Sequence, residues 1–282
     1  MASYARHTQP ATRMSPKPRR FLNRLLKYLG KASLIVLVLF VLPVGCQYAK
    51  QLQRNDANWW DLRRDSSEQA PPAITGTAVV QVYAARAARW RGNFGVHTWV
   101  AFKRTDDLDY FRIEVIGYRA YYGNNSVRVR TGNPDSYWFG NRPTLLREIT
   151  GGEEVDEMIN RLITAAENYP YPRTYRVWPG PNSNTFIAWL ARSVPELNLE
   201  LPPTAVGKDY LPNGSIAALT PSRRGAQISL GGYAGLLLGV EEGIEMNVLG
   251  ATVGVDFWPP AIKLPALGRL GFDDVRRYDL TN

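Results

Sequence analysis

The residues best suited to chemistry are a histidine, a serine and a glutamate that lie far apart in the chain. His97 lies in the strand-like segment Gly95–Lys103 and is the only histidine beyond the N-terminal region. Ser183 follows a Pro-Gly-Pro-Asn turn at the start of an expected helix, where free backbone amides stabilise a developing oxyanion. Glu114 lies in another strand-like segment. The pattern predicts a triad with His97 as general base, Ser183 as nucleophile and Glu114 as the carboxylate that orients the base.

Each of these residues also has a purely structural interpretation. A lone histidine in a strand is commonly a hydrogen-bonded packing residue, and Asn182 or Ser183 after such a turn is what a helix N-cap requires. In that case the cleft between His97 and Ser183 would bind a ligand without hydrolysing it. Its expected binding residues are Trp99, Trp178, Asn182 and Trp189. Three functions stay open: a ligand-binding or pseudoenzyme module, an active serine hydrolase or amidase, and a structural module of an envelope assembly.

Two blocks, residues 97–103 (HTWVAFK) and 178–186 (WPGPNSNTF), resemble an uncharacterised family of single-span bacterial membrane proteins known only as a domain of unknown function. The resemblance covers about Val79 to Tyr210 and implies no known activity. More distantly, the blocks are similar to circularly permuted papain-like hydrolases of the cell-wall amidase type. Ser183 stands where those enzymes have their cysteine. The resemblance therefore implies a papain-like scaffold that binds a cell-wall or lipid-related ligand and has lost its chemistry.

A mixed α+β domain over residues 76–212 must position these side chains. Runs of β-branched and aromatic residues, separated by Gly, Asn or Asp, predict a papain-like antiparallel sheet with two main packed helices. Apolar residues recur at helical spacing over residues 155–166 and predict the first helix, with Thr150 and Glu153 in capping-box relation. The second helix is expected at Thr185–Ser193. The expected strands are Ala78–Ala84, Val96–Lys103, Tyr110–Tyr118 and Val127–Thr131.

Residues 213–282 have a different texture, with short apolar runs spaced by glycine. We expect a glycine-rich β extension here. Its expected strands are Gln227–Leu230, Leu236–Val240, Glu245–Leu249 and Thr252–Asp256.

The N-terminal region predicts where the domain resides. The first 31 residues carry eight lysines and arginines and no acidic residue, and an apolar run follows. We expect a basic cytoplasmic tail (1–31), one transmembrane helix (32–49) and a polar stalk (50–75). This places the chain in the inner membrane as a single-pass protein with its main domain outside the cytoplasm. A second interpretation is a lipoprotein signal that ends at Cys46, the chain's single cysteine.

Composition excludes several function classes. The net charge of +9 comes almost entirely from the tail, because the rest of the chain has 26 basic and 25 acidic residues. A nearly neutral domain predicts no nucleic-acid partner. With one histidine and no cysteine in the domain, no transition-metal site is expected. No phosphate-binding or dinucleotide fingerprint predicts a cofactor.

Overall fold

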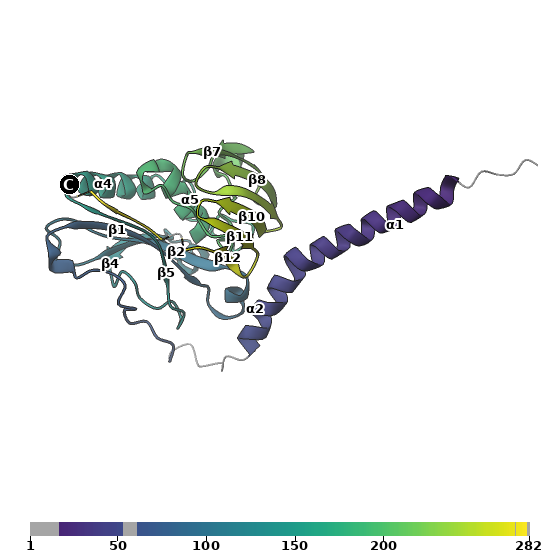
Figure 1. The fold of residues 1–282 in the computed structure, drawn as a ribbon. Coiled ribbons are helices and arrows are strands. Elements are labelled where there is room, and N and C mark those ends of the chain that lie inside the picture. The colour runs from purple at the N-terminus through teal and green to yellow at the C-terminus, as the bar shows by residue number, and fades with distance from the viewer. Residues whose placement is uncertain (1–16, 53–60, 274, 281–282) are drawn as a thin grey trace, which may run out of the picture. The chain divides into compact units, whose positions relative to one another are not determined.

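The computed structural model describes residues 17–52, 61–273 and 275–280 and divides the chain into two units, residues 1–38 and 39–282 (Figure 1). A helix begins the described chain as α1 (Lys17–Val36). It continues through a π-helical turn (Leu37–Val41) into α2 (Leu42–Leu52). Pro43 has no N–H to donate to the helical ladder, and the π-helical turn lies just before it.

The stretch Asn23–Lys50 is long and apolar enough to cross a membrane, and it contains the expected span, residues 32–49. By length and composition it is a candidate membrane anchor. Arg6 and Arg13 of the expected cytoplasmic tail lie outside the described residues, as do Trp59 and Trp60 of the expected stalk.

The first sheet of the second unit has six strands in the order β13-β5-β1-β2-β3-β4. Neighbouring strands are antiparallel, except that β13 runs parallel to β5. The prediction of the second and fourth strands is correct to the residue, whereas the third is shorter than expected and β5 was not expected. The strands are β1 (Ala78–Arg86), β2 (Val96–Lys103), β3 (Phe111–Val115), β4 (Val127–Thr131), β5 (Thr144–Gly151) and β13 (Arg276–Asp279).

Two helices, α4 (Glu153–Glu167) and α5 (Ser183–Ser193), cover one face of this sheet (Figure 1). Their apolar stripes and the strand residues facing them form the main hydrophobic core. The short helix α3 (Gly117–Tyr121) follows β3. The expected capping box before α4 is wrong, because Thr150 belongs to β5 and the N-cap is Gly152, with no side-chain cap.

The second sheet has seven strands, and each pairs antiparallel with the next along the chain. The expected β extension is therefore present as a meander. The extension was expected to run from residue 213 to residue 282, but the C-terminal strand β13 pairs with β5 of the first sheet. The strands are β6 (Ala217–Leu219), β7 (Gly225–Leu230), β8 (Ala234–Gly239), β9 (Gly243–Val248), β10 (Ala251–Phe257), β11 (Pro260–Leu264) and β12 (Gly268–Gly271).

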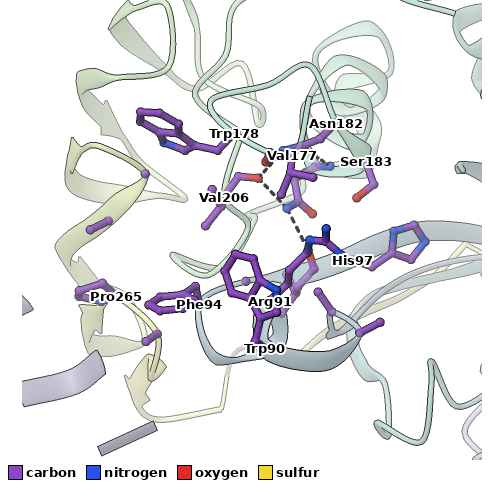
Figure 2. A pocket seen from close by; sticks show the side chains of 18 of the residues that line it. Trp90, Arg91, Phe94, His97, Val177, Trp178, Asn182, Ser183, Val206 and Pro265 are labelled. Carbon is purple, nitrogen blue, oxygen red and sulfur yellow. Dashed lines mark hydrogen bonds between the residues drawn. The ribbon is translucent and has the colours of Figure 1, made fainter. Parts of the chain in front are cut away.

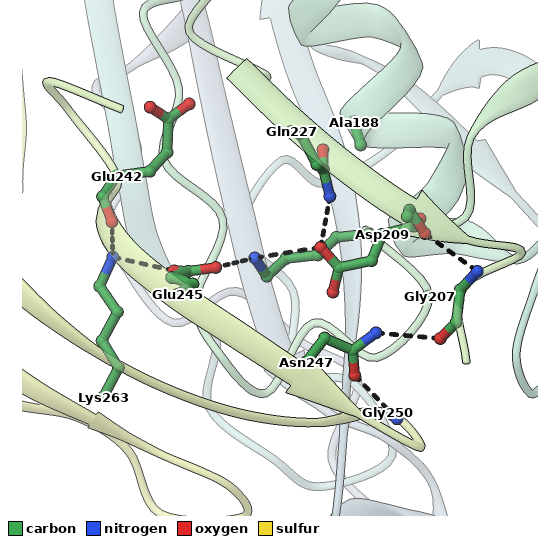
Figure 3. Close-up of polar contacts among 12 residues, drawn as sticks. Ala188, Gly207, Asp209, Gln227, Glu242, Glu245, Asn247, Gly250 and Lys263 are labelled. Atoms are coloured by element: carbon green, nitrogen blue, oxygen red, sulfur yellow. Dashed lines mark hydrogen bonds and ion pairs between the residues drawn. The ribbon is translucent and has the colours of Figure 1, made fainter. Parts of the chain in front are cut away.

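Beneath the second sheet lies a buried network of charged side chains (Figure 3). Lys208 forms an ion pair with Glu245. The Nζ of Lys263 lies 2.5 Å from Glu200 Oε1, 2.9 Å from Glu245 Oε1 and 3.5 Å from Asp256 Oδ1. Three carboxyl groups thus surround one ammonium group. Burial, together with repulsion from Asp256 and Glu245, outweighs the attraction of Lys263 and raises the pKa of Glu200 to about 8.

This raised pKa predicts a decline in stability with rising pH. The folded state holds a proton on Glu200 up to about pH 8, whereas the unfolded state releases it near 4.5. The contribution of Glu200 to the free energy of unfolding is fully present below its unfolded-state pKa. It is lost as pH rises through its folded-state pKa. In the wild type, the free energy of unfolding should fall by on the order of 1 kcal/mol per pH unit between these two pKa values. Glu200→Gln should remove this decline, which urea unfolding at several pH values measures. A decline of equal slope in both proteins would contradict the assignment.

Candidate functional site

The side-chain amide of Asn182 holds the N-terminus of α5 through four hydrogen bonds. Asn182 Oδ1 accepts hydrogen bonds from the backbone N–H groups of Asn184 (2.9 Å) and Thr185 (3.1 Å). Thr185 Oγ1 accepts one from the Asn182 N–H, which completes a capping box. Asn182 Nδ2 donates to the carbonyls of Val177 and Val206, each at 2.9 Å. Asn182 is therefore the N-cap, one of the two residues expected there.

Ser183 is the first residue of α5 and is buried. Its backbone N–H has no partner inside the helix, as for every first helical residue. Ser183 therefore combines a hydroxyl with a free amide at the positive end of a helix, the combination that binds anions and oxyanions.

His97 and Glu114 are in contact, as expected. His97 Nε2 lies 3.3 Å from Glu114 Oε2, and the imidazole stacks on Trp138 with ring centroids 3.9 Å apart. Glu114 is fully buried and also pairs with Arg112 (2.8 Å) and Arg130 (3.1 Å).

Electrostatics fix the charge states of this pair. Burial lowers the pKa of His97 and outweighs the attraction of Glu114, so the imidazole is neutral at pH 7. Burial alone would raise the pKa of Glu114, but the hydrogen bond from His97 and the charges of Arg112 and Arg130 hold it at about 2. The ionised carboxylate can only accept, so Nε2 carries the proton.

The structure brings two of the three expected triad residues to one cavity, and the third, Glu114, is buried behind His97. His97 and Ser183 both line it. Within the described residues, however, no hydrogen bond links the imidazole to the Ser183 hydroxyl. The strand explains this, because Thr98 points toward α5 and donates to Asn184 Oδ1 (2.9 Å), so that its neighbour His97 faces the other side of the sheet.

The shared cavity has a volume of about 500 Å³ and is mostly apolar (Figure 2). Trp90 and Phe94, from the short helix Arg89–Asn93 and the residue after it, line it together with Trp178. His97 and Ser183 lie at the opposite end from Trp178 in Figure 2. A cavity of this size accepts a small organic ligand, with polar groups at one end to orient it.

Of the four expected ligand-binding residues, two line this cavity and two lie elsewhere. Trp178 and Asn182 are in its wall. Trp99 is fully buried in a core cluster on the His97 face of the sheet, where it stacks on Tyr83 and donates its indole N–H to Pro134. Trp189 packs against the main core and donates to the Ala165 carbonyl. The last two are therefore packing residues, because their polar atoms are bonded inside the fold.

A second cavity of about 610 Å³ adjoins the first, since Trp138 and Phe139 line both. This second cavity was not predicted from the sequence. The available signal was the alternation of arginine along β4, whose register sets Arg128 opposite Glu114 and Arg130 opposite Arg112. Among the described residues, five arginines line this cavity: Arg64, Arg112, Arg119, Arg128 and Arg130.

Fold and site together define a mixed α+β domain that follows a candidate membrane anchor and carries an apolar cavity beside an arginine-lined one. Residues 77–210 match a family described as "Protein of unknown function (DUF3750)". This confirms the expected resemblance to a family of unknown function, over nearly the expected residues. No curated protein matches the chain, and no solved structure does. The matched segment contains β1 to α5, and with them His97, Glu114 and Ser183.

Proposed function

We propose that this chain is a membrane-anchored binding protein for an amphipathic anion, a lipid-related molecule with an apolar body and a phosphate-type head. The observation that carries the proposal is the adjacency of the two cavities. Trp138 and Phe139 line both, so one ligand can place its apolar part against Trp90, Phe94 and Trp178 and its charged part among the arginines.

The charge balance of the arginine-lined cavity supports an anionic head. Five arginines line this cavity among the described residues, and the buried carboxylate of Glu114 pairs with two of them, Arg112 and Arg130. Like charges directly opposite on neighbouring strands are destabilising, yet Arg112 and Arg130 are such a pair. Arg112 is buried, and among the described residues its Nε has no hydrogen-bond partner. A phosphate group would relieve this repulsion and use the planar donors of the guanidinium groups.

The test is binding of short-chain phosphatidic acid to the detergent-solubilised chain, measured by calorimetry. Arg128→Gln should weaken binding at least tenfold, because a charge-assisted contact contributes about 1.5–3 kcal/mol. Arg161→Gln is the matched control, since Arg161 lies on α4 and pairs with Glu196. Short-chain phosphatidylcholine should bind more weakly than phosphatidic acid. Equal affinity of wild type and Arg128→Gln would overturn the proposal.

A second candidate function is a serine hydrolase on a papain-like scaffold, with Ser183 as nucleophile, His97 as base and Glu114 orienting it. The His97–Glu114 contact and the free amide of Ser183 at the α5 N-terminus support this candidate. Against it stands the missing link between base and nucleophile, which catalysis requires within about 3 Å. The missing link therefore favours a pseudoenzyme, which binds a ligand on this scaffold without hydrolysing it, over an active hydrolase.

An activated-serine probe separates the two candidates. Labelling that is lost in Ser183→Ala but kept in Ser193→Ala would establish the hydrolase. We expect no labelling of Ser183, because among the described residues His97 bonds to Glu114 and no hydrogen bond joins it to the Ser183 hydroxyl. Mass spectrometry of the labelled peptides gives the readout.

The proposed location is the inner membrane, with the tail in the cytoplasm and the domain outside it. The basic residues that precede the candidate span support this orientation. A phosphatase fused after Asn282 would then be active, and an inactive fusion with normal expression would reverse the orientation.

A further inference from the structure

The polarity of the seven-stranded sheet is inverted relative to that of a water-exposed sheet. The inward positions of its central strands carry polar side chains, among them Gln227, Glu245, Asn247 and Lys263, each at most 4 % exposed. The outward positions carry apolar ones. An antiparallel sheet with one wet face normally shows the reverse arrangement. The outer face of this sheet is therefore built for a partner other than water.

A continuous apolar row crosses this outer face. Leu238 pairs with Ile244, Ile244 with Val255, Val255 with Ile262 and Ile262 with Leu270. These five side chains, which we call the apolar row, come from five neighbouring strands and are 40–55 % exposed. At about 4.8 Å between strands the row is roughly 20 Å long. An exposed apolar patch of this extent marks a protein or membrane contact.

The charges around the apolar row point to a lipid surface as the occupant. Residues 213–272 contain four acidic residues, and all of them are buried: Glu241, Glu242, Glu245 and Asp256. The exposed charges of this segment include Arg223 and Arg224, in the turn between β6 and β7. Among the described residues, the first exposed carboxylate after β6 is Asp273, beyond the end of β12. An apolar face with exposed arginines beside it and buried carboxylates beneath it is complementary to a bilayer with anionic headgroups.

The length of the connecting chain is compatible with this occupant. The helix that contains the candidate span ends at Leu52, and the first strand begins at Ala78. Even fully extended, a connection of this length spans at most roughly 90 Å. A domain tethered this way stays close to the bilayer, which raises the effective concentration of lipid at the apolar row.

We propose that the outer face of the seven-stranded sheet, centred on the apolar row, rests in the interfacial region of an anionic bilayer. This inference is independent of the ligand proposed for the two cavities. It concerns the outward side of the sheet.

The full chain reconstituted in phosphatidylglycerol-containing liposomes tests the inference. In a Cys46→Ser background, a polarity-sensitive fluorophore on Ile244→Cys should show blue-shifted emission and be quenched several-fold by nitroxide-labelled lipids. The matched control is Glu157→Cys on α4, whose side chain is 65 % exposed. That fluorophore should stay water-exposed and unquenched.

Three outcomes are decisive. Strong quenching at position 244 with little at position 157 supports the bilayer contact. Blue-shifted emission at 244 without lipid quenching, growing with the ratio of protein to lipid, would show that a second copy covers the face and would overturn the proposal. Equal, water-like emission at both positions would overturn it as well. Leu238→Lys, which places a charge in the apolar row, should reduce quenching at 244 if the bilayer is the occupant.

Discussion

Replacing Glu114 by glutamine is expected to lower the free energy of unfolding by about 3–5 kcal/mol, the cost of breaking a buried ion pair from one side. Glu114 is the buried carboxylate between Arg112, Arg130 and His97. An amide of the same size keeps the packing but leaves the Arg112 guanidinium buried without its counter-charge. Urea unfolding of the solubilised chain near pH 7 measures the loss.

The pH dependence identifies the carboxylate as the cause. Because the pKa of Glu114 is held at about 2, below the unfolded value of 4.5, its contribution is present above 4.5 and is lost as pH falls toward 2. The difference between wild type and Glu114→Gln should therefore shrink in acid. Glu157→Gln, at an exposed position of α4, is the control and should change stability little. Equal stabilities of wild type and Glu114→Gln near pH 7 would show that the carboxylate is not the centre of this network.

Replacing Asn182 by alanine is the second change with a large expected effect, about 3 kcal/mol. Loss of the cap costs about 1 kcal/mol. The carbonyls of Val177 and Val206 also lose one hydrogen bond each, at about 0.5–1.5 kcal/mol per bond. The Val206 carbonyl keeps a second donor in Asn184 Nδ2. Gly207 adds to the fit, since it has a positive φ of 98° and a Cβ there would collide with the Asn182 amide.

A serine at position 182 provides the matched comparison. Its hydroxyl can still accept from the first turn of α5 but cannot reach the two carbonyls, so Asn182→Ser should be about 1 kcal/mol more stable than Asn182→Ala. Thermal and urea unfolding give both values. If the two variants were equally stable, capping would not contribute at this position.

The elements around the polar end of the apolar cavity were predictable because local signals agree there. Residues 96–103 are β-branched or aromatic at most positions, and β2 has those bounds. The Pro-Gly-Pro-Asn turn predicts a helix start, and α5 begins directly after Asn182. The contact between His97 and Glu114 followed from the expectation that their strands lie in one sheet.

Other features could not be predicted because they depend on tertiary context. The alternation of polar and apolar residues in β7 to β11 indicates strands but not which face is buried, and here the polar face is the inner one. The pairing of β13 with β5 is a contact between residues far apart in the chain. Trp99 and Trp189 have the composition of ligand-binding residues, and only the fold shows that they pack inside it.

The central claim is that the apolar cavity beside His97 and Ser183 holds the apolar part of a lipid-related ligand. Photo-crosslinking of the solubilised full chain with a short-chain phosphatidic acid that carries a diazirine in its acyl chain tests it directly. The account predicts saturable crosslinks at cavity-lining residues, and their loss on competition with unlabelled phosphatidic acid. These residues include Trp90, Arg91, Phe94, Val177, Trp178, Leu249, Gly250 and Ala251. Crosslinks confined to the candidate span Asn23–Lys50, or cavity crosslinks that no competitor removes, would contradict it.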